Sequence, residues 1–383
     1  MEGKMRSMYF DFKDIFKSNR IAFSVQRIWI QFAGMAAAYL IYLVFTYASL
    51  MTAGKGFAEM WRQMGLFPCL ARVEANWYSW IIFIAGVLLL VLFYMVTSTA
   101  VSRAAYMLLK GNTFYTWRES FRFSFRKMVS VIMSPVAIAV LIALLVLGGV
   151  VVGLLAKIPF VGELGLSLFM PLWIVGGLLI VFFAIVLIVA LVYTPSVIAT
   201  TDDDAFEAVF QSFSTFWSQP WRMILYQALS LALSVAGIVV FAFLVKRAFL
   251  VVDAIAASII GDKYMNLMGH GMYVLSDWIA SFTDWLNSVC GENLSKFYFG
   301  REFLQLKLPA ILNVSSHIFA MMMLIIGGWV LSYGFANFNV ATTLSYLVLR
   351  KKKENDNLLE RVDKEEEEED DQEEVQEKTE EKS

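Results

Sequence analysis

Long parts of this chain lack charge altogether. Six stretches contain no Asp, Glu, Lys or Arg: residues 28–54, 75–102, 128–156, 164–201, 223–245 and 308–349. Each stretch exceeds the roughly 20 apolar residues that a helix needs to cross a bilayer. The pattern excludes a soluble protein and predicts an all-α fold. We expect a polytopic integral membrane protein with six transmembrane helices.

The side chains that usually carry chemistry are also scarce. The only two histidines, His270 and His317, do not have the spacing of metal ligands. No carboxylate pair lies inside an apolar stretch, and neither a phosphate-binding Gly-x4-Gly-Lys-Ser/Thr loop nor a Gly-x-Ser-x-Gly elbow occurs. We therefore expect no catalytic residue, bound metal or cofactor, no enzymatic activity and no nucleic-acid partner.

The charge that is present is divided between two regions. Residues 354–383 hold 16 acidic and 4 basic side chains, a net charge of −12, against −2 for the whole chain, which leaves +10 for the rest. Such an acidic segment without aromatic residues cannot bury enough apolar surface to fold alone. We predict a basic segment over 1–27, a transmembrane domain over 28–350 and a disordered acidic tail over 351–383. The tail is either simply solvated or a docking segment for a basic protein partner or the chain's own basic loops.

Basic residues also predict the orientation in the membrane. They gather in the N-terminal segment, between the second and third apolar stretches, and after the sixth. Loops rich in Lys and Arg stay in the cytoplasm, so both termini are expected there, in a multi-pass protein of the cell membrane, specifically a bacterial inner membrane. The long loop over 246–307 is then external. Within it, the spacing of apolar residues from Leu275 to Val289 predicts one amphipathic helix.

A short motif occurs twice between apolar stretches. Glu119-x4-Ser124-Phe125 and Glu207-x4-Ser212-Phe213 each lie between two predicted spans. Apolar side chains recur at helical spacing in both segments, which predicts amphipathic helices lying on the inner leaflet. Beside the first apolar stripe lie four candidate contacts for anionic lipid: Arg118, Arg122, Arg126 and Lys127. The alternative is that both stripes simply pack against neighbouring spans.

The second motif and the last apolar stretch carry a resemblance. A helix with Glu207-Ala208 and Ser212-Phe213 follows a span, Trp221-Arg222 enters the next, and the last span runs into Thr342-x3-Tyr346-x3-Arg350. This pattern resembles uncharacterised bacterial six-span membrane proteins described as the membrane domain of glycerophosphoryl diester phosphodiesterase. The resemblance implies six spans built from hairpin repeats and says little about activity. The chain has no phosphodiesterase catalytic domain, so that enzymatic activity is not expected.

The two cysteines, Cys69 and Cys290, both fall in predicted external loops. An oxidising compartment permits a disulfide between them. The alternative is that the two share a face by coincidence, because sequence alone gives no distance between them.

The leading functional hypothesis is a non-enzymatic membrane protein that acts through lipid or protein contacts, in envelope organisation or membrane-protein assembly. The alternative is a transporter or channel for an apolar or amphipathic solute. Transport predicts a polar pocket in the middle of the membrane, and the candidate lining residues are Gln31, Ser98, Gln227, Asn313 and His317. Spans without ionisable residues disfavour this alternative, because such residues usually mark transport pathways.

Overall fold

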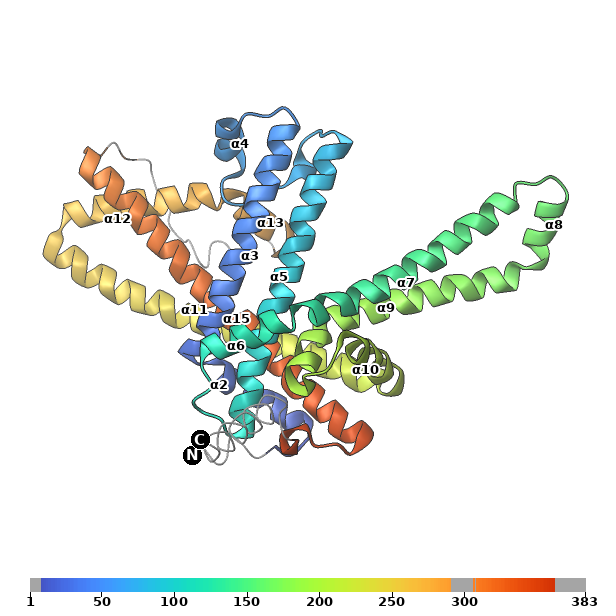
Figure 1. Ribbon diagram of the computed structural model, residues 1–383. Helices are drawn as coiled ribbons and strands as arrows, with labels where there is room; N and C mark the ends of the chain where they lie inside the picture. Colours follow the sequence, from blue (N-terminus) through green and yellow to red (C-terminus); the bar gives the residue numbers. More distant parts are fainter. Residues whose placement is uncertain (1–7, 291–305, 307, 362–383) are drawn as a thin grey trace, which may run out of the picture. The chain divides into compact units, whose positions relative to one another are not determined.

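The computed structural model describes residues 8–290, 306 and 308–361, and in this part of the chain no strand occurs. Six helices are long and apolar enough to cross a membrane (Figure 1): α3 (Val25–Thr52), α5 (Trp77–Lys110), α7 (Met128–Leu155), α9 (Met170–Thr201), α11 (Pro220–Ile260) and α15 (Ala310–Glu354). The predicted all-α fold with six membrane spans is confirmed. The exposed faces of these helices are mainly apolar, as lipid requires of a membrane span.

Shorter helices connect and flank the spans. They are η1 (Phe12–Lys17), α2 (Ser18–Ala22), α4 (Phe57–Met64), η2 (Leu70–Arg72), α6 (Trp117–Arg126), α8 (Val161–Leu168), α10 (Ala205–Ser218), α12 (Asp262–Trp278), α13 (Ala280–Cys290) and η3 (Leu358–Glu360). The acidic tail predicted over 351–383 begins inside α15 and continues through η3. From residue 362 onward it lies outside the described residues.

The chain divides into two compact units that cut across the spans. The first unit comprises Met1–Ile30, Met95–Ser234 and Phe335–Ser383, and the second comprises Gln31–Tyr94 and Val235–Gly334. Helices α3, α5, α11 and α15 therefore each contribute one part to each unit. This division differs from the predicted one, in which a single transmembrane domain separates the two terminal segments.

The last turns of α15 form the centre of the first unit. Every residue from Val340 to Leu349 is buried, so this part of the helix is surrounded on all sides. Hydroxyl groups link it to its neighbours: Ser196 lies 3.2 Å from Thr343, and Ser230 lies 3.3 Å from Ser345. Small hydroxyl residues allow close helix packing and supply hydrogen bonds where water is absent.

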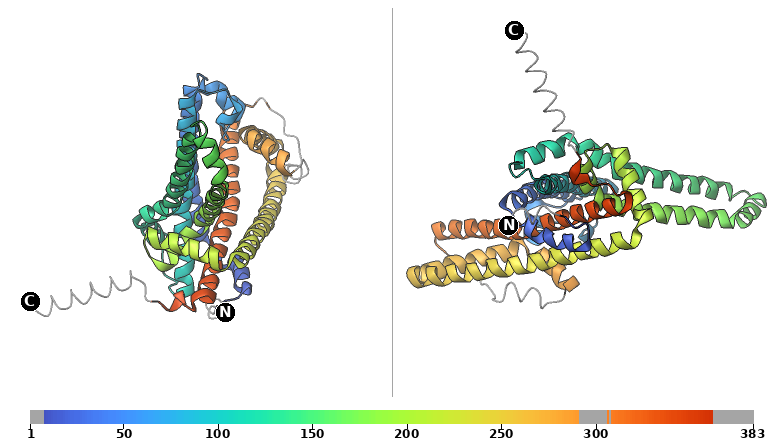
Figure 2. Two further views of the ribbon diagram at one scale, coloured as in Figure 1. Left: turned by 90° about the vertical axis from the view of Figure 1, so that its right-hand side faces the viewer. Right: turned by 90° about the horizontal axis from the view of Figure 1, so that it is seen from below.

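Helices α7 and α9 form a hairpin whose base belongs to the core of the first unit. The ammonium group of Lys127 lies 2.7 Å from the Asp202 carboxylate, and Ser134 lies 3.2 Å from Thr194. Beyond Ile138, α7 has no buried residue. The far halves of the two helices run side by side away from the rest of this unit (Figures 1 and 2). Their exposed side chains are apolar, as a lipid environment requires.

The second unit packs α4 and the following loop against the end of α3. Tyr47, Leu50, Met60, Met64 and Leu70 form a buried apolar cluster. The hydroxyl of Tyr42 donates to the carbonyl of Pro68 at 2.7 Å, and the hydroxyls of Tyr39 and Tyr47 donate to the carbonyls of Leu66 and Gly65. Three tyrosines on one helix thus hold the loop by its backbone.

The helix predicted from Leu275 to Val289 is interrupted in the structure. Helix α12 ends at Trp278 and α13 begins at Ala280. The carbonyl of Trp278 accepts the backbone N–H of Leu66 at 3.0 Å, while the N–H of Phe282 donates to Ile279. A distant segment therefore takes the acceptor that would have continued the helix. The loop predicted over 246–307 is also shorter than expected, because α11 continues to Ile260.

The contact with Trp278 makes Gly65 sensitive to substitution. Gly65 has φ +55°, and a Cβ there would lie 2.5 Å from the carbonyl oxygen of Trp278. Gly54 provides a matched control, since it has φ +82° and open space around the Cβ position. We expect G54A to cost about 1–2 kcal/mol of backbone strain. G65A should lower the thermal unfolding temperature in detergent clearly more than G54A does. An equal decrease in unfolding temperature for the two variants would contradict this packing.

Candidate lipid-binding surface

The N-terminus of α6 is fixed by a capping box. The backbone N–H of Glu119 donates to the Thr116 hydroxyl at 3.3 Å, and the N–H of Thr116 donates to the Glu119 carboxylate at 2.6 Å. This reciprocal arrangement satisfies two donors that the first turn would leave unpaired. The first residue of the motif therefore has a structural role here. In α10 the corresponding Glu207 accepts a hydrogen bond from Gln211 instead.

The two motif helices bury the same positions. In α6 these are Ser120, Phe123 and Ser124, which lie one, four and five residues after Glu119. In α10 the residues at the same distances from Glu207 are also buried, namely Ala208, Gln211 and Ser212. The hydroxyl of Ser124 donates to the Val96 carbonyl of α5, whereas Ser212 donates within its own helix to Ala208 at 2.8 Å. The repeat seen in the sequence thus extends to burial but not to hydrogen bonding.

A fully buried arginine lies beneath α6. The guanidinium carbon of Arg103 in α5 lies 4.2 Å from the centre of the Phe123 ring, and its Nη1 donates to the Ala199 carbonyl of α9 at 3.1 Å. The loop before α6 is also held, because Gln26 of α3 donates to the Tyr115 carbonyl at 2.7 Å. The contacts of α6 to α5, and of its preceding loop to α3, therefore fix which face of α6 points outward.

The outward face of α6 combines aromatic rings with arginines. Phe114 is 90% exposed, Phe125 55% and Trp117 41%. Arg118 and Arg122 are exposed beside this stripe, with the Arg118 guanidinium 5.3 Å from the centre of the Trp117 ring. Neither arginine has an ion-pair partner in the part of the chain that the structure describes. Aromatic rings next to unpaired cations are the side chains that suit the headgroup region of a membrane.

The other two candidate lipid contacts differ from this pair. Lys127 also donates to the backbone carbonyl of Asp202 at 2.8 Å, so its charge lies at the base of the hairpin. Arg126 lies 3.8 Å from the same carboxylate. Asp202 ends α9 in the left-handed conformation with φ +53° and is buried. The structure thus separates Arg118 and Arg122 from two residues already paired within the protein.

Helix α10 presents a different surface. Phe213 and Phe216 pack on Phe182 of α9, with ring centres 5.5 and 5.8 Å apart. Phe206 and Trp217 remain exposed, and the helix contains no Lys or Arg. Part of its predicted apolar stripe therefore packs against a span, and the rest is apolar surface without a basic stripe.

Segments distant in sequence meet in the first unit. Lys352 lies 3.3 Å from the Asp11 carboxylate, the Tyr106 hydroxyl donates to the Leu358 carbonyl at 2.7 Å, and Lys353 donates to Ser214 at 2.6 Å. The backbone N–H of Phe12, together with Lys352, lowers the pKa of Asp11 below its usual value. The N-terminal segment, the end of α5 and α10 therefore meet the end of α15 and the chain after it within the first unit.

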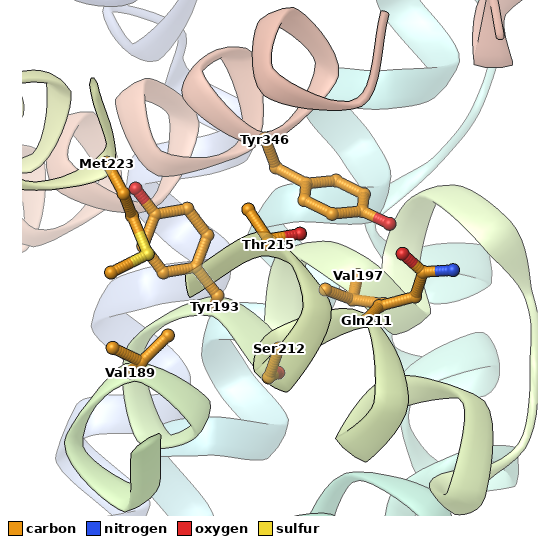
Figure 3. A pocket seen from close by; sticks show the side chains of 8 residues that line it. All are labelled: Val189, Tyr193, Val197, Gln211, Ser212, Thr215, Met223 and Tyr346. Atoms are coloured by element: carbon orange, nitrogen blue, oxygen red, sulfur yellow. The ribbon is translucent and has the colours of Figure 1, made fainter. Parts of the chain in front are cut away.

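A pocket with no room for a water molecule lies among α9, α10, α11 and α15 (Figure 3). Its lining includes Tyr193, Gln211, Thr215 and Tyr346, and in Figure 3 the Tyr346 hydroxyl points toward the Gln211 amide. The two tyrosine hydroxyls and the Gln211 carbonyl oxygen are buried without a hydrogen-bond partner among the described residues. Sequence reasoning singled out Tyr346 by the Thr-x3-Tyr-x3-Arg pattern but missed Tyr193 and Gln211. Gln211 stands next to the motif serine, which is the one signal that could have found it.

Two predictions remain open. Cys69 has a free thiol in the structure, and the side chain of Cys290 lies outside the described residues, so the disulfide stays a prediction.

Comparisons with family models, with curated proteins and with solved structures found no match. The resemblance to the phosphodiesterase-associated membrane domain likewise stays a prediction.

The contribution of the Tyr346 hydroxyl to stability can be compared with that of the hydrogen-bonded Tyr106 hydroxyl. Tyr106 and Tyr346 are both fully buried tyrosines of the first unit. The Tyr106 hydroxyl donates to the Leu358 carbonyl, whereas the Tyr346 hydroxyl has no hydrogen-bond partner among the described residues. We expect Y106F to lower the free energy of unfolding by about 1 kcal/mol, because it leaves that hydrogen bond unmade. Y346F should be neutral or stabilising in the same thermal unfolding assay. An equal loss for Y346F would contradict a Tyr346 hydroxyl without a hydrogen-bond partner.

Proposed function

We propose that this protein is a non-enzymatic membrane protein that binds anionic lipid headgroups through α6. The observation that carries the proposal is the outward face of this helix, where Trp117 and Phe125 are exposed beside Arg118 and Arg122, two exposed arginines with no ion-pair partner among the described residues. Such binding suits a role in envelope organisation or in the assembly of other membrane proteins. The setting we propose is the cytoplasmic leaflet of a bacterial inner membrane.

The chemistry of these side chains supports anionic lipid as the ligand. A guanidinium group offers paired donors that match the oxygens of a phosphate, and aromatic rings favour the depth of the headgroups. Basic residues near an anionic leaflet contribute about 1 kcal/mol each. Because Phe123 and Ser124 anchor α6 to the spans, little ordering of the helix is needed on binding.

The orientation rests on charge. The chain outside the acidic segment carries +10 against −2 for the whole. The basic N-terminal segment, the end of α5 and the lysines at the end of α15 meet in one unit, as the contacts of Asp11 and Leu358 require. A face that collects this many Lys and Arg residues is the one expected to remain in the cytoplasm.

The transport alternative has less support. None of its candidate lining residues lines the pocket of the first unit. Two of them make contacts with neighbouring helices: Gln227 donates to Thr342 at 3.3 Å, and Asn313 lies 3.2 Å from His270. A third, His317, is exposed and contacts the Asn313 carbonyl at 2.8 Å. These contacts favour structural roles for the three residues.

The proposal predicts which arginines matter. Replacing both exposed arginines of α6 in the variant R118Q/R122Q should weaken retention of anionic lipid by about tenfold to thirtyfold, since about 2 kcal/mol is lost. The measurement is native mass spectrometry of the full chain released from nanodiscs of mixed anionic and zwitterionic lipid. The fold should remain, because neither side chain is buried.

A matched control removes two arginines elsewhere. Arg62 and Arg72 are exposed in the second unit, outside α6, so R62Q/R72Q makes the same change in net charge. This variant should retain anionic lipid like the unmodified chain. Equal losses in both variants, or equal retention of anionic and zwitterionic lipid by the unmodified chain, would contradict a site on α6.

A further inference from the structure

The chain after α15 is anchored beside the end of α5. It turns at Asn355, which has φ +56°, and then forms η3, where Leu358 is 1% exposed. The Tyr106 hydroxyl holds the Leu358 carbonyl, and Asn357 accepts the N–H of Leu359 at 3.3 Å. The acidic segment therefore starts from a fixed point on α5, the span that leads directly into α6.

Local ion pairs already occupy the first acids of this segment. Arg350 lies 2.7 Å from Glu354 and 3.5 Å from Asp356, and Arg361 lies 2.7 Å from Asp356. The acids that follow are different. Residues 362–383 contain 13 acidic and 3 basic side chains, so this segment carries a net charge of −10. Nearly all of that negative charge has no base nearby in sequence to balance it.

The basic face of α6 lies within the reach of a chain tethered at Leu358. Lys110 follows Tyr106 by one helical turn, with its ammonium group 5.9 Å from the Tyr106 ring centre, and α6 begins after residues 111–116. The 22 residues of 362–383 span about 70 Å when extended, several times the roughly 15 Å length of α6. A segment tethered this closely reaches a local concentration on the order of millimolar.

We propose that residues 362–383 dock on the arginine face of α6 in the same chain and there compete with anionic lipid. The competition rests on the proposed function of α6, whereas docking itself does not. Charge complementarity selects the occupant: a segment of net charge −10 that follows the anchor at Leu358 is complementary to two exposed arginines without an ion-pair partner among the described residues. The segment would thereby limit lipid binding until an anionic leaflet displaces it.

Carbodiimide coupling tests the docking, because it joins a carboxylate to an amine only when the two are in contact. The conservative variant R118K/R122K keeps the charge of α6 and supplies the amines, and R62K/R72K is its control. In zwitterionic nanodiscs, peptide mass spectrometry should find several-fold more links from residues 362–383 to positions 118 and 122 than to 62 and 72. High salt, which shortens the screening length to about 3 Å, should abolish them. Equal or absent links would overturn the docking.

A second arm separates docking from lipid binding. Adding anionic lipid should reduce the links at positions 118 and 122 several-fold, and a chain ending at Arg361 should retain more anionic lipid than the full chain. Links that ignore anionic lipid would overturn the competition and leave the docking in place. If R118Q/R122Q does not change lipid retention even in the shortened chain, the proposed function itself fails, while the links still decide the docking. Coupling to a co-purified basic protein instead of α6 would also overturn the proposal.

Discussion

The structure depends on one constraint, which is that lipid cannot satisfy a polar group. Many hydroxyls in the spans therefore find an acceptor inside the protein, often four residues back in their own helix, as Ser230 does with the Tyr226 carbonyl and Ser345 with that of Ala341. Such residues then make a second contact to each other across α11 and α15 at 3.3 Å. The buried end of α15 follows from this constraint, because a helix surrounded by others must satisfy its polar side chains within the bundle.

The same constraint explains how α6 is held. Arg103 is completely buried, and its guanidinium group lies between the ring of Phe123 and the Ala199 carbonyl. A buried cation needs such partners, since an unpaired charge away from water is very costly. By meeting that need, Arg103 joins α5, α6 and α9. One face of α6 is thereby committed to the spans, which leaves the aromatic and basic residues of the other face exposed.

Sequence predicted the features that depend on neighbouring residues. Absence of charge over a long stretch is a local property, so all six spans were recognisable. The charge-free stretch ends before Lys246 and Arg247, so the sequence alone underestimates the length of α11. In the structure the Arg247 guanidinium lies 4.9 Å from the centre of the Phe243 ring, one turn back, and the helix continues. A long basic side chain can keep its head outside apolar surroundings without ending a helix.

Features that depend on distant segments could not be predicted in this way. The break after Trp278 requires the N–H of Leu66, and the use of Lys127 at the hairpin base requires Asp202. The pocket joins Tyr193, Gln211 and Tyr346 from three helices, and nothing in the local pattern of each residue reports the others. The candidate lipid surface was recognisable as a stripe, but only contacts from other helices distinguish Arg118 and Arg122 from Arg126 and Lys127.

The position of Leu358 gives the charge asymmetry of the chain a physical meaning. If α6 binds lipid as proposed, headgroups meet it at high local concentration, yet each contact is weak, at about 1 kcal/mol per basic residue. A tethered acidic segment at a millimolar effective concentration would compete on similar terms. With two weak ligands of comparable strength on one surface, occupancy would follow the anionic content of the leaflet, because a change in either ligand shifts the balance. A more strongly basic site, or an acidic segment attached far from α6, would remove this dependence. Moderate charge on α6 and an anchor at Leu358 are therefore the features that a lipid-dependent occupancy of α6 requires.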